Sequence, residues 1–391
     1  MFKVPPAGKC QLKLKVTGYQ NDQNFGMIKY ANFTPVPDFA PEACTLDIEK
    51  IHATRPSPET IRGFMVGNFS DETATNMLAW GANGVRLQYG CNHFYVQAGK
   101  DWEKGRKNMV DTMERNVQLA RKHGLRVVID LHGAFYDGKA ANRWFDPQFE
   151  KDLIGLWKDI ATRLQPYPDT VWGYDLLNEP LDWDQMPRPP QQWRRFAEQI
   201  LKTIRAIDKG VWIIYEPGPG GLAGGFADLV PLPDYKVIYS SHYYSPHTLT
   251  HQGIADISKT DLEKAKMRIG IAYPGVIDGV YWDKKEIERN LKVVDDFLAK
   301  YPFPHLLGEF SIIRWAPPGS GKAYLQDVLE CAEARNWSWT YHAFAEYDGW
   351  SLEYGNEYPY KNMPPLQKVQ GGTDRGKVIK RFLEFNKKNI E

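Results

Sequence analysis

Two glutamates stand where hydrophobic segments of this chain end abruptly. Glu179 lies in an Asn-Glu-Pro sequence after residues 171–177 (VWGYDLL), and Glu309 follows residues 305–308 (HLLG). Glutamate is mostly exposed in folded proteins, so a solvent-facing loop residue is the ordinary interpretation of each. Two carboxyl groups held about 5–5.5 Å apart can also break a glycosidic bond, one as proton donor and the other as nucleophile. The elements that carry the two residues decide between these interpretations.

Other polar residues follow hydrophobic segments in the same way. They are Arg86, His132, Asn178, Glu216, His242, Tyr244 and His342. Any one of them could be a structural residue whose polar atoms are satisfied by its neighbours. Branched apolar side chains normally fill the interior of a barrel, so many polar groups at one level indicate a functional site.

The elements that must position these residues alternate from about residue 61 onward. Hydrophobic segments that predict strands are residues 62–67, 83–87, 125–131, 171–177, 211–215, 237–241, 305–308 and 337–341. Amphipathic segments that predict helices are residues 71–80, 108–123, 146–164, 191–207, 323–335 and 376–387. Continuous apolar strands, most of them followed by a helix, indicate an α/β fold, a (β/α)8 TIM barrel. An open doubly wound sheet is the alternative, and it is weakened because no GxGxxG turn follows the first strand.

The first 55 residues stand outside this alternation. Residues 11–16 (QLKLKV) alternate polar and apolar side chains, which is typical of a strand with one buried face. We expect residues 1–55 to form a short N-terminal β extension, a hairpin cap, and residues 56–391 to form the catalytic barrel. Residues 243–283 are rich in Gly, Tyr, Pro and His and predict an irregular loop over the barrel mouth.

A barrel would bring the two glutamates together. The carboxyl ends of the strands and the loops after them build the active site of a TIM barrel. Strands four and seven lie on opposite sides, so Glu179 and Glu309 are expected to face each other across the mouth. Arg86 and Tyr244 are expected to contact Glu309 and to hold it ionised through charge-assisted hydrogen bonds. Glu179, with more apolar cover, is expected to keep its proton near neutral pH.

Five motifs, in order along the chain, resemble glycoside hydrolase family 5, whose barrels carry two glutamates on strands four and seven. They are GANGVRL with Arg86, VVIDLHG with His132, Asn178-Glu179-Pro180, SHYY with His242 and Tyr244, and LLGEF with Glu309. The resemblance runs from about residue 55 to the end. It implies that Glu179 is the acid/base, that Glu309 is the nucleophile and that Asn178 binds the sugar 2-hydroxyl. It also implies that His132, His242 and Tyr244 line the cleavage subsite, with no metal and no organic cofactor.

One position departs from the family pattern, which places a tryptophan at the end of strand eight as a floor for the sugar. In residues 337–344 (WSWTYHAF), Trp339 comes too early and His342 or Phe344 stands where that ring is expected. Trp350 in the following loop is another candidate, so His342 and Trp350 join the expected substrate-binding residues. Three more tryptophans follow strand ends and are either stacking platforms or packed loop residues: Trp144, Trp183 and Trp315.

Two further acids and a set of histidines have alternative interpretations. Glu216, in IIYEPGPGG, resembles the Asn-Glu-Pro ending, but the family's active pair does not use this position, so a secondary role is expected. Asp130 is expected to make a structural hydrogen bond. The histidines His132, His242 and His247 lack the spacing of a metal site, so no metal is expected.

Composition limits the partners and the compartment. The 49 basic and 48 acidic residues give a net charge of +1, which favours neither nucleic acid nor an anionic membrane. No apolar run is long enough to span a bilayer, and a monomer is expected. The four cysteines form no CxxC pair, although Cys10 and Cys44 could pair if the chain is exported. The first residues lack the apolar core of a signal peptide, yet a secreted or periplasmic location is favoured because polymeric glycans lie outside cells.

The expected function is therefore retaining hydrolysis of β-1,4-linked glucan by an endoglucanase or cellulase. The alternatives are a β-mannanase, a xyloglucanase or an exo-acting β-glucosidase of the same family. A barrel that binds sugar without cleaving it is the alternative from another class. The expected partner is a β-glycan polysaccharide or oligosaccharide.

Overall fold

Eight parallel strands form a closed barrel in the computed structural model, which describes residues 44–55, 57–134, 143–254, 269–359 and 363–388. Around the barrel the strands follow the order β1-β10-β9-β6-β5-β4-β3-β2. Their bounds are β1 Arg62–Val66, β2 Gly84–Gly90, β3 Arg126–Gly133, β4 Val171–Asp175, β5 Trp212–Tyr215, β6 Val237–Tyr243, β9 His305–Phe310 and β10 Ser338–Tyr341. All eight predicted strands are present, and the closed sheet excludes the open alternative.

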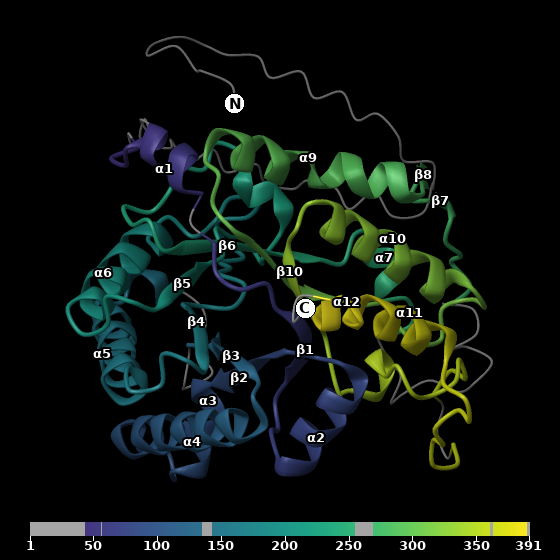
Figure 1. The fold of residues 1–391 in the computed structure, drawn as a ribbon, viewed down its shortest axis with the longest axis horizontal. Coiled ribbons are helices and arrows are strands. Elements are labelled where there is room, and N and C mark those ends of the chain that lie inside the picture. Colours follow the sequence, from purple (N-terminus) through teal and green to yellow (C-terminus); the bar gives the residue numbers. More distant parts are fainter. Residues whose placement is uncertain (1–43, 56, 135–142, 255–268, 360–362, 389–391) are drawn as a thin grey trace, which may run out of the picture. The chain divides into compact units, whose positions relative to one another are not determined.

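Helices surround the barrel, as Figure 1 shows. The longer helices are α2 Asp71–Trp80, α4 Trp102–His123, α5 Pro147–Leu164, α6 Trp193–Arg205, α9 Lys284–Lys300, α10 Ser320–Ala334 and α11 Asp374–Leu383. Short ones are α1 Ile48–Thr54, α3 Cys91–Gln97, η1 Arg143–Phe145, η2 Ala223–Phe226, α7 His247–Thr250, η3 Asp348–Trp350 and α12 Phe385–Lys388. The fold is therefore the expected (β/α)8 TIM barrel.

The helix ends follow local sequence signals. Ser70 caps α2 by accepting a hydrogen bond from the backbone N–H of Thr73, and Gly81 ends the helix at φ 100°. Asp146 caps α5 and is followed at once by Pro147, a residue suited to the first helical turn. These signals explain why α2 and α5 were predicted closely. In contrast, α4 begins at Trp102 and not near residue 108, and α9 was not predicted from the sequence.

Two local predictions were wrong. The fourth strand was expected to continue to Leu177, where Asn-Glu-Pro stops it, but β4 ends two residues earlier, at Asp175. The chain after it turns, and Glu179 adopts a left-handed backbone with φ 47°, which a strand cannot contain. Residues 243–283 were expected to be irregular, yet they contain α7 and a hairpin of β7 Gly275–Ile277 with β8 Val280–Trp282.

The N-terminal extension is described only in part. The hairpin expected at residues 11–16 and Cys10 lie outside the described residues, so the hairpin and a Cys10–Cys44 pair stay predictions. Residues 48–54, inside the expected extension, form α1, whose N-terminus Asp47 caps by accepting from the backbone N–H of Lys50. Among the described residues, no helix is long and apolar enough to cross a membrane.

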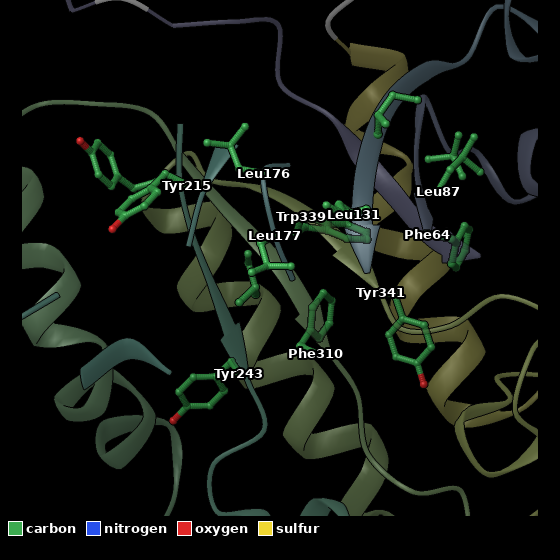
Figure 2. Close-up of a cluster of buried hydrophobic side chains, with 14 of the residues drawn as sticks. Phe64, Leu87, Leu131, Leu176, Leu177, Tyr215, Tyr243, Phe310, Trp339 and Tyr341 are labelled. Atoms are coloured by element: carbon green, nitrogen blue, oxygen red, sulfur yellow. The ribbon is translucent and has the colours of Figure 1, made fainter. Parts of the chain in front are cut away.

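Two hydrophobic layers enclose the strands. The outer layer joins the sheet to the helices, and Figure 2 shows part of it, with Phe64 from β1, Leu131 from β3 and Phe310 from β9. A smaller inner cluster consists of Ile61, Val128, Trp172, Ile214, Ile238 and Leu306. Apolar burial on both faces explains why the strand sequences are nearly continuous hydrophobic runs.

A layer of inward-facing polar side chains lies above this inner cluster, because side chains alternate between the two faces of each strand. Side chains two residues apart share one face of a strand, so the inward Val128 is followed on β3 by Asp130 and then His132. In the same way Ile214 of β5 precedes Glu216, and both are fully buried. The polar residues therefore sit at one level, near the carboxyl ends of the strands.

Candidate active site

Glu309 reaches the barrel interior because of an irregularity in β9. The pairing of β6 with β9 shifts so that Ser241 aligns with Leu307 but His242 aligns with Glu309, which leaves Gly308 without a partner. A Cβ at Gly308 would lie 2.8 Å from the Ser240 hydroxyl oxygen, so only glycine fits this close approach. The extra residue turns Glu309 inward.

Three neighbours surround the Glu309 carboxylate. Arg86 donates from Nη1 to Oε1 at 2.7 Å, and the Tyr244 hydroxyl donates to Oε2 at 2.9 Å. His342 Nδ1 lies 3.3 Å from the same Oε2 and 2.6 Å from the Tyr244 hydroxyl. The contacts expected from Arg86 and Tyr244 are therefore both present.

The charge of this carboxylate is fixed by its neighbours. Burial by itself raises the pKa of Glu309, but the charge of His242, the hydrogen bond and charge of His342, and the charge of Arg86 outweigh it. The net result is a pKa well below the ordinary value of 4.5. Glu309 is thus an anion at neutral pH, buried and aimed at the barrel mouth.

Arg86 is the central cation of the site. It is fully buried, and besides Glu309 it contacts Asp175, Glu216 and Asp130 at 2.9, 3.2 and 3.1 Å. Burial lowers the pKa of Arg86, but the four carboxylates raise it well above its ordinary value. Burial raises the pKa of Asp175 well above its usual range despite the opposing charge of Arg86. One buried cation therefore organises four acids.

Glu179 has different surroundings. Its carboxylate Oε1 lies 2.8 Å from His242 Nδ1, and its backbone N–H donates to Glu216 Oε2 at 2.9 Å. Its side chain is 39% exposed, against 4% for Glu309. The expectation that Glu179 has the more apolar cover is therefore wrong: the short turn after β4 lifts it toward solvent, while the β9 irregularity buries Glu309.

The two carboxylates do face each other. Single carboxylate oxygens of Glu179 and Glu309 and a ring nitrogen of His242 all lie within 4.8 Å of one another. A gap of this size spans one glycosidic bond, whereas a water-mediated inverting arrangement needs about 6.5–9.5 Å.

His132 and Asn178 are held at the rim by buried acids and by Arg86. His132 Nδ1 lies 2.9 Å from Asp130 Oδ2, so Asp130 makes the expected structural hydrogen bond. Burial lowers the pKa of His132, but the charge and hydrogen bond of Asp130 and the charge of Glu309 together outweigh it, and the net direction is upward. Asn178 accepts at Oδ1 from Arg86 Nη2 at 3.0 Å, which orients its amide nitrogen as a donor.

His242 is buried between three acids. Its Nδ1 lies 2.8 Å from Glu179 and 3.7 Å from Glu309, and its Nε2 lies 3.0 Å from Glu216 Oε1. Burial lowers the pKa of His242, while the charges of Glu216 and Glu309 raise it well above the ordinary value. The imidazole therefore hydrogen-bonds Glu179 through Nδ1, while its Nε2 lies beside the Glu216 carboxylate without hydrogen-bond geometry.

Trp350 and His342 occupy different layers at the end of β10. The Trp350 ring is buried and packs near Tyr244, His251 and His342, with centroids 6.2, 5.0 and 6.2 Å away. His342 also contacts the Glu309 carboxylate, with Nδ1 3.3 Å from Oε2. Trp350 supports Tyr244 and His342 from behind.

Only one of the three loop tryptophans presents its ring to solvent. Trp183, in the loop after β4, is 79% exposed. Trp144 is buried, stacks on Phe196 and donates from Nε1 to the carbonyl of Leu181. Trp315 is buried and donates to the carbonyl of Gln252. Packing is therefore the explanation for these last two residues.

Three of these residues also lie close enough together to hold a metal ion. Glu179, His242 and Glu309 form a set close enough to hold an ion, although each already contacts other groups of the site. His247, named with His132 and His242 in the sequence, instead stacks on His251 at 3.7 Å between ring centroids. The expectation of no metal stays a prediction.

A model of the cellulase family, glycosyl hydrolase family 5, matches residues 55–348. The chain belongs to glycosyl hydrolase family 5. Endoglucanase C of Acetivibrio thermocellus is 22% identical over 278 residues, covering 65% of this chain and 77% of that protein. Cellodextrinase A of Ruminococcus flavefaciens is 31% identical over 192 residues, covering 48% and 54%.

Solved structures of this family agree. Endoglucanase Cel5A from Thermotoga maritima superposes with a TM-score of 0.62 at 26% identity, covering 75% of this chain and 91% of that one. Family 5 membership and endoglucanase relatives identify the chain as a glycoside hydrolase, not a barrel that only binds sugar. Its substrate and its residue roles are proposed below.

Proposed function

We propose that this family 5 hydrolase is a retaining endo-β-1,4-glucanase in which Glu309 is the nucleophile and Glu179 the acid/base. The observation that carries the proposal is the pair of facing carboxylates, with oxygens within 4.8 Å in unlike surroundings. Glu309 is buried and anionic, as a nucleophile must be. Glu179 is half-exposed at the mouth, where a leaving group and water can reach it.

The reaction follows in two steps. Glu309 attacks the anomeric carbon and forms a glycosyl–enzyme ester while Glu179 protonates the departing oxygen. Water then enters from the side that the leaving group vacated, and Glu179 takes its proton as the water attacks the ester carbon. Two displacements at one carbon retain its configuration.

Other residues bind the sugar. Asn178, with its amide nitrogen turned from Arg86, donates to the 2-hydroxyl, and His132 lies at the same rim. Tyr244 and His342 border Glu309 and so contact the sugar at the cleavage point. Trp350 holds both from behind.

The relatives support β-1,4-glucan as the substrate. They include endoglucanase C and cellodextrinase A, and Thermotoga maritima Cel5A has been crystallised with cellobiose. The same enzyme has been crystallised with mannotriose, which makes β-mannan the second candidate. Because such polymers lie outside cells, we propose that the enzyme acts there. Sizing of products from glucan, mannan and xyloglucan separates these substrates and endo from exo cleavage.

Two variants test the assignment of roles. Glu309→Ala is expected to lower hydrolysis of an aryl β-cellobioside by about 10⁵-fold or more, because it removes a covalent step. Glu179→Ala should recover activity with azide, which attacks the glycosyl–enzyme without base assistance. Asp184→Ala, an exposed acid on the same loop, is the control. Product of inverted configuration by NMR, or full activity of Glu309→Ala, contradicts the proposal.

A further inference from the structure

Glu216 is a third carboxylate at the site, and neither the family pair nor the reaction above uses it. It ends the apolar run of β5, is fully buried and faces the barrel interior. Its partners are Arg86, His242 and the backbone of Glu179. A buried carboxylate is costly unless paired, so these contacts define what this residue does.

The hydrogen bond between Glu216 and the backbone N–H of Glu179 fixes the backbone of Glu179. Glu179 sits at φ 47°, a left-handed conformation that is unfavourable for a residue with a Cβ. Glu216 Oε2 accepts its N–H at 2.9 Å, a charge-assisted hydrogen bond that keeps this conformation in place. The direction of the Glu179 side chain depends on that backbone.

The contact between Glu216 and His242 influences which ring nitrogen of His242 carries a proton. Glu216 Oε1 lies 3.0 Å from Nε2, an electrostatic contact without hydrogen-bond geometry, and its negative charge favours a proton on that nitrogen. The other nitrogen, Nδ1, faces Glu179 Oε1 at 2.8 Å. With Nε2 protonated, Nδ1 and Glu179 share the one remaining proton. Gly221, whose Cβ would lie 3.2 Å from Glu216 Oε2, closes the β5 loop over this pair.

We infer that Glu216 is a positioning residue that acts through Glu179, fixing its backbone and keeping the proton that it shares with His242 available to the leaving group. This inference rests on the proposed acid/base role of Glu179. Glu216 does not touch the sugar and acts on proton donation, not on nucleophilic attack. Arg86, which also contacts Glu216, offers the competing route toward Glu309.

Leaving groups of unequal acidity distinguish these routes. 2,4-Dinitrophenolate departs without a proton, whereas phenolate needs one, so only the phenyl substrate depends on the acid. For Glu216→Gln we expect kcat/KM to fall by about 10²-fold with phenyl β-cellobioside and by under about 5-fold with the dinitrophenyl substrate. Glu179→Ala should show the same pattern more strongly. Asp175→Asn, another buried acid on Arg86, should leave the ratio between substrates unchanged.

The outcomes separate the inference from the function on which it rests. Equal losses on both substrates for Glu216→Gln, with the pattern present in Glu179→Ala, overturn the positioning role. A missing pattern in Glu179→Ala overturns the acid/base assignment itself. If Glu216→Gln does not fold, nitrogen-15 NMR of the wild-type histidines decides, with His242→Asn assigning the signal. When the His242 ring becomes neutral as pH rises, the proton that remains is expected on Nε2, and a neutral ring protonated on Nδ1 contradicts the inference.

Discussion

At the scale of single residues, the two glutamates of the site differ in burial and in the groups that surround them. Glu309 receives the hydrogen bonds and charge of Arg86, Tyr244 and His342, and it is buried. Glu179 contacts His242, whose charge also acts on Glu309, and is far more exposed to solvent. Unequal surroundings are what give two identical side chains different roles in one reaction.

Replacing His342 tests this description. In His342→Gln the pKa of Glu309 is expected to rise, because a hydrogen bond and a nearby positive charge that lower it are lost. A nucleophile with a higher pKa stays protonated to higher pH, so the acid limb of the kcat/KM profile should move upward by about one pH unit. Tyr347→Phe, near Trp350 but away from Glu309, is the control. An unmoved acid limb contradicts the prediction.

At the scale of elements, the backbone of the loop after β5 packs closely against the His242 ring. Gly221 lies at φ 68°, and a Cβ there would come within 2.9 Å of the His242 ring. Gly220 lies at φ 60° with open space around its Cβ position. Both glycines adopt a left-handed backbone, but only Gly221 lies close to another side chain, that of His242.

Alanine substitutions at Gly220 and Gly221 distinguish the cost of the left-handed backbone from the effect of a steric clash with His242. Both Gly221→Ala and Gly220→Ala should lose about 1 kcal/mol of unfolding free energy from the left-handed backbone. Only Gly221→Ala should also lower kcat, by about 10-fold or more, because His242 must move away from Glu179. Thermal unfolding and kinetics with an aryl β-cellobioside measure the two effects. Equal kcat values for Gly220→Ala and Gly221→Ala would contradict this prediction.

The loop after β4 offers a second test at this scale. Trp183 lies four residues beyond Glu179 and exposes its ring, so it can stack on a sugar on the leaving-group side. Trp183→Ala is expected to raise KM for cello-oligosaccharides about 10-fold and to leave hydrolysis of a short aryl glycoside nearly unchanged. Trp144→Phe, a buried neighbour, should instead affect stability. Equal effects on long and short substrates would contradict a stacking role.

At the scale of the whole molecule, the base of the barrel holds a histidine that resists protonation. His305 starts β9, is buried, and its Nε2 lies 3.0 Å from the Ser241 hydroxyl. Burial, and then the charge of Arg335, lower the pKa of His305 to about 3 from 6.5. The folded chain therefore excludes a proton that the unfolded chain accepts.

This difference predicts a pH dependence of stability. Between pH 6.5 and about 3 the unfolded chain binds the extra proton, so the free energy of unfolding falls as pH falls. The contribution of His305 is up to about 1.4 kcal/mol per pH unit. His305→Gln should flatten the fall, measured by denaturant unfolding from pH 7 to 4, and the exposed His93→Gln should not. Parallel curves for wild type and His305→Gln would disprove it.

The sequence determined the fold, the order of the strands and the rim residues. Apolar runs of strand length between amphipathic segments leave few topologies, and parallel strands place all their carboxyl ends at one rim. Arg86, His132, Glu179, His242 and Glu309 could therefore be predicted as neighbours before any coordinates were known.

Only the tertiary structure decided how those side chains face one another. The unpaired Gly308 turns Glu309 inward, and the left-handed backbone of Glu179 lifts its carboxylate toward solvent. Glu216 resembled a secondary acid in the sequence, yet it touches Glu179, His242 and Arg86. Shifts of one residue in strand pairing and the partners of buried charges depend on contacts between distant segments, which local patterns do not contain.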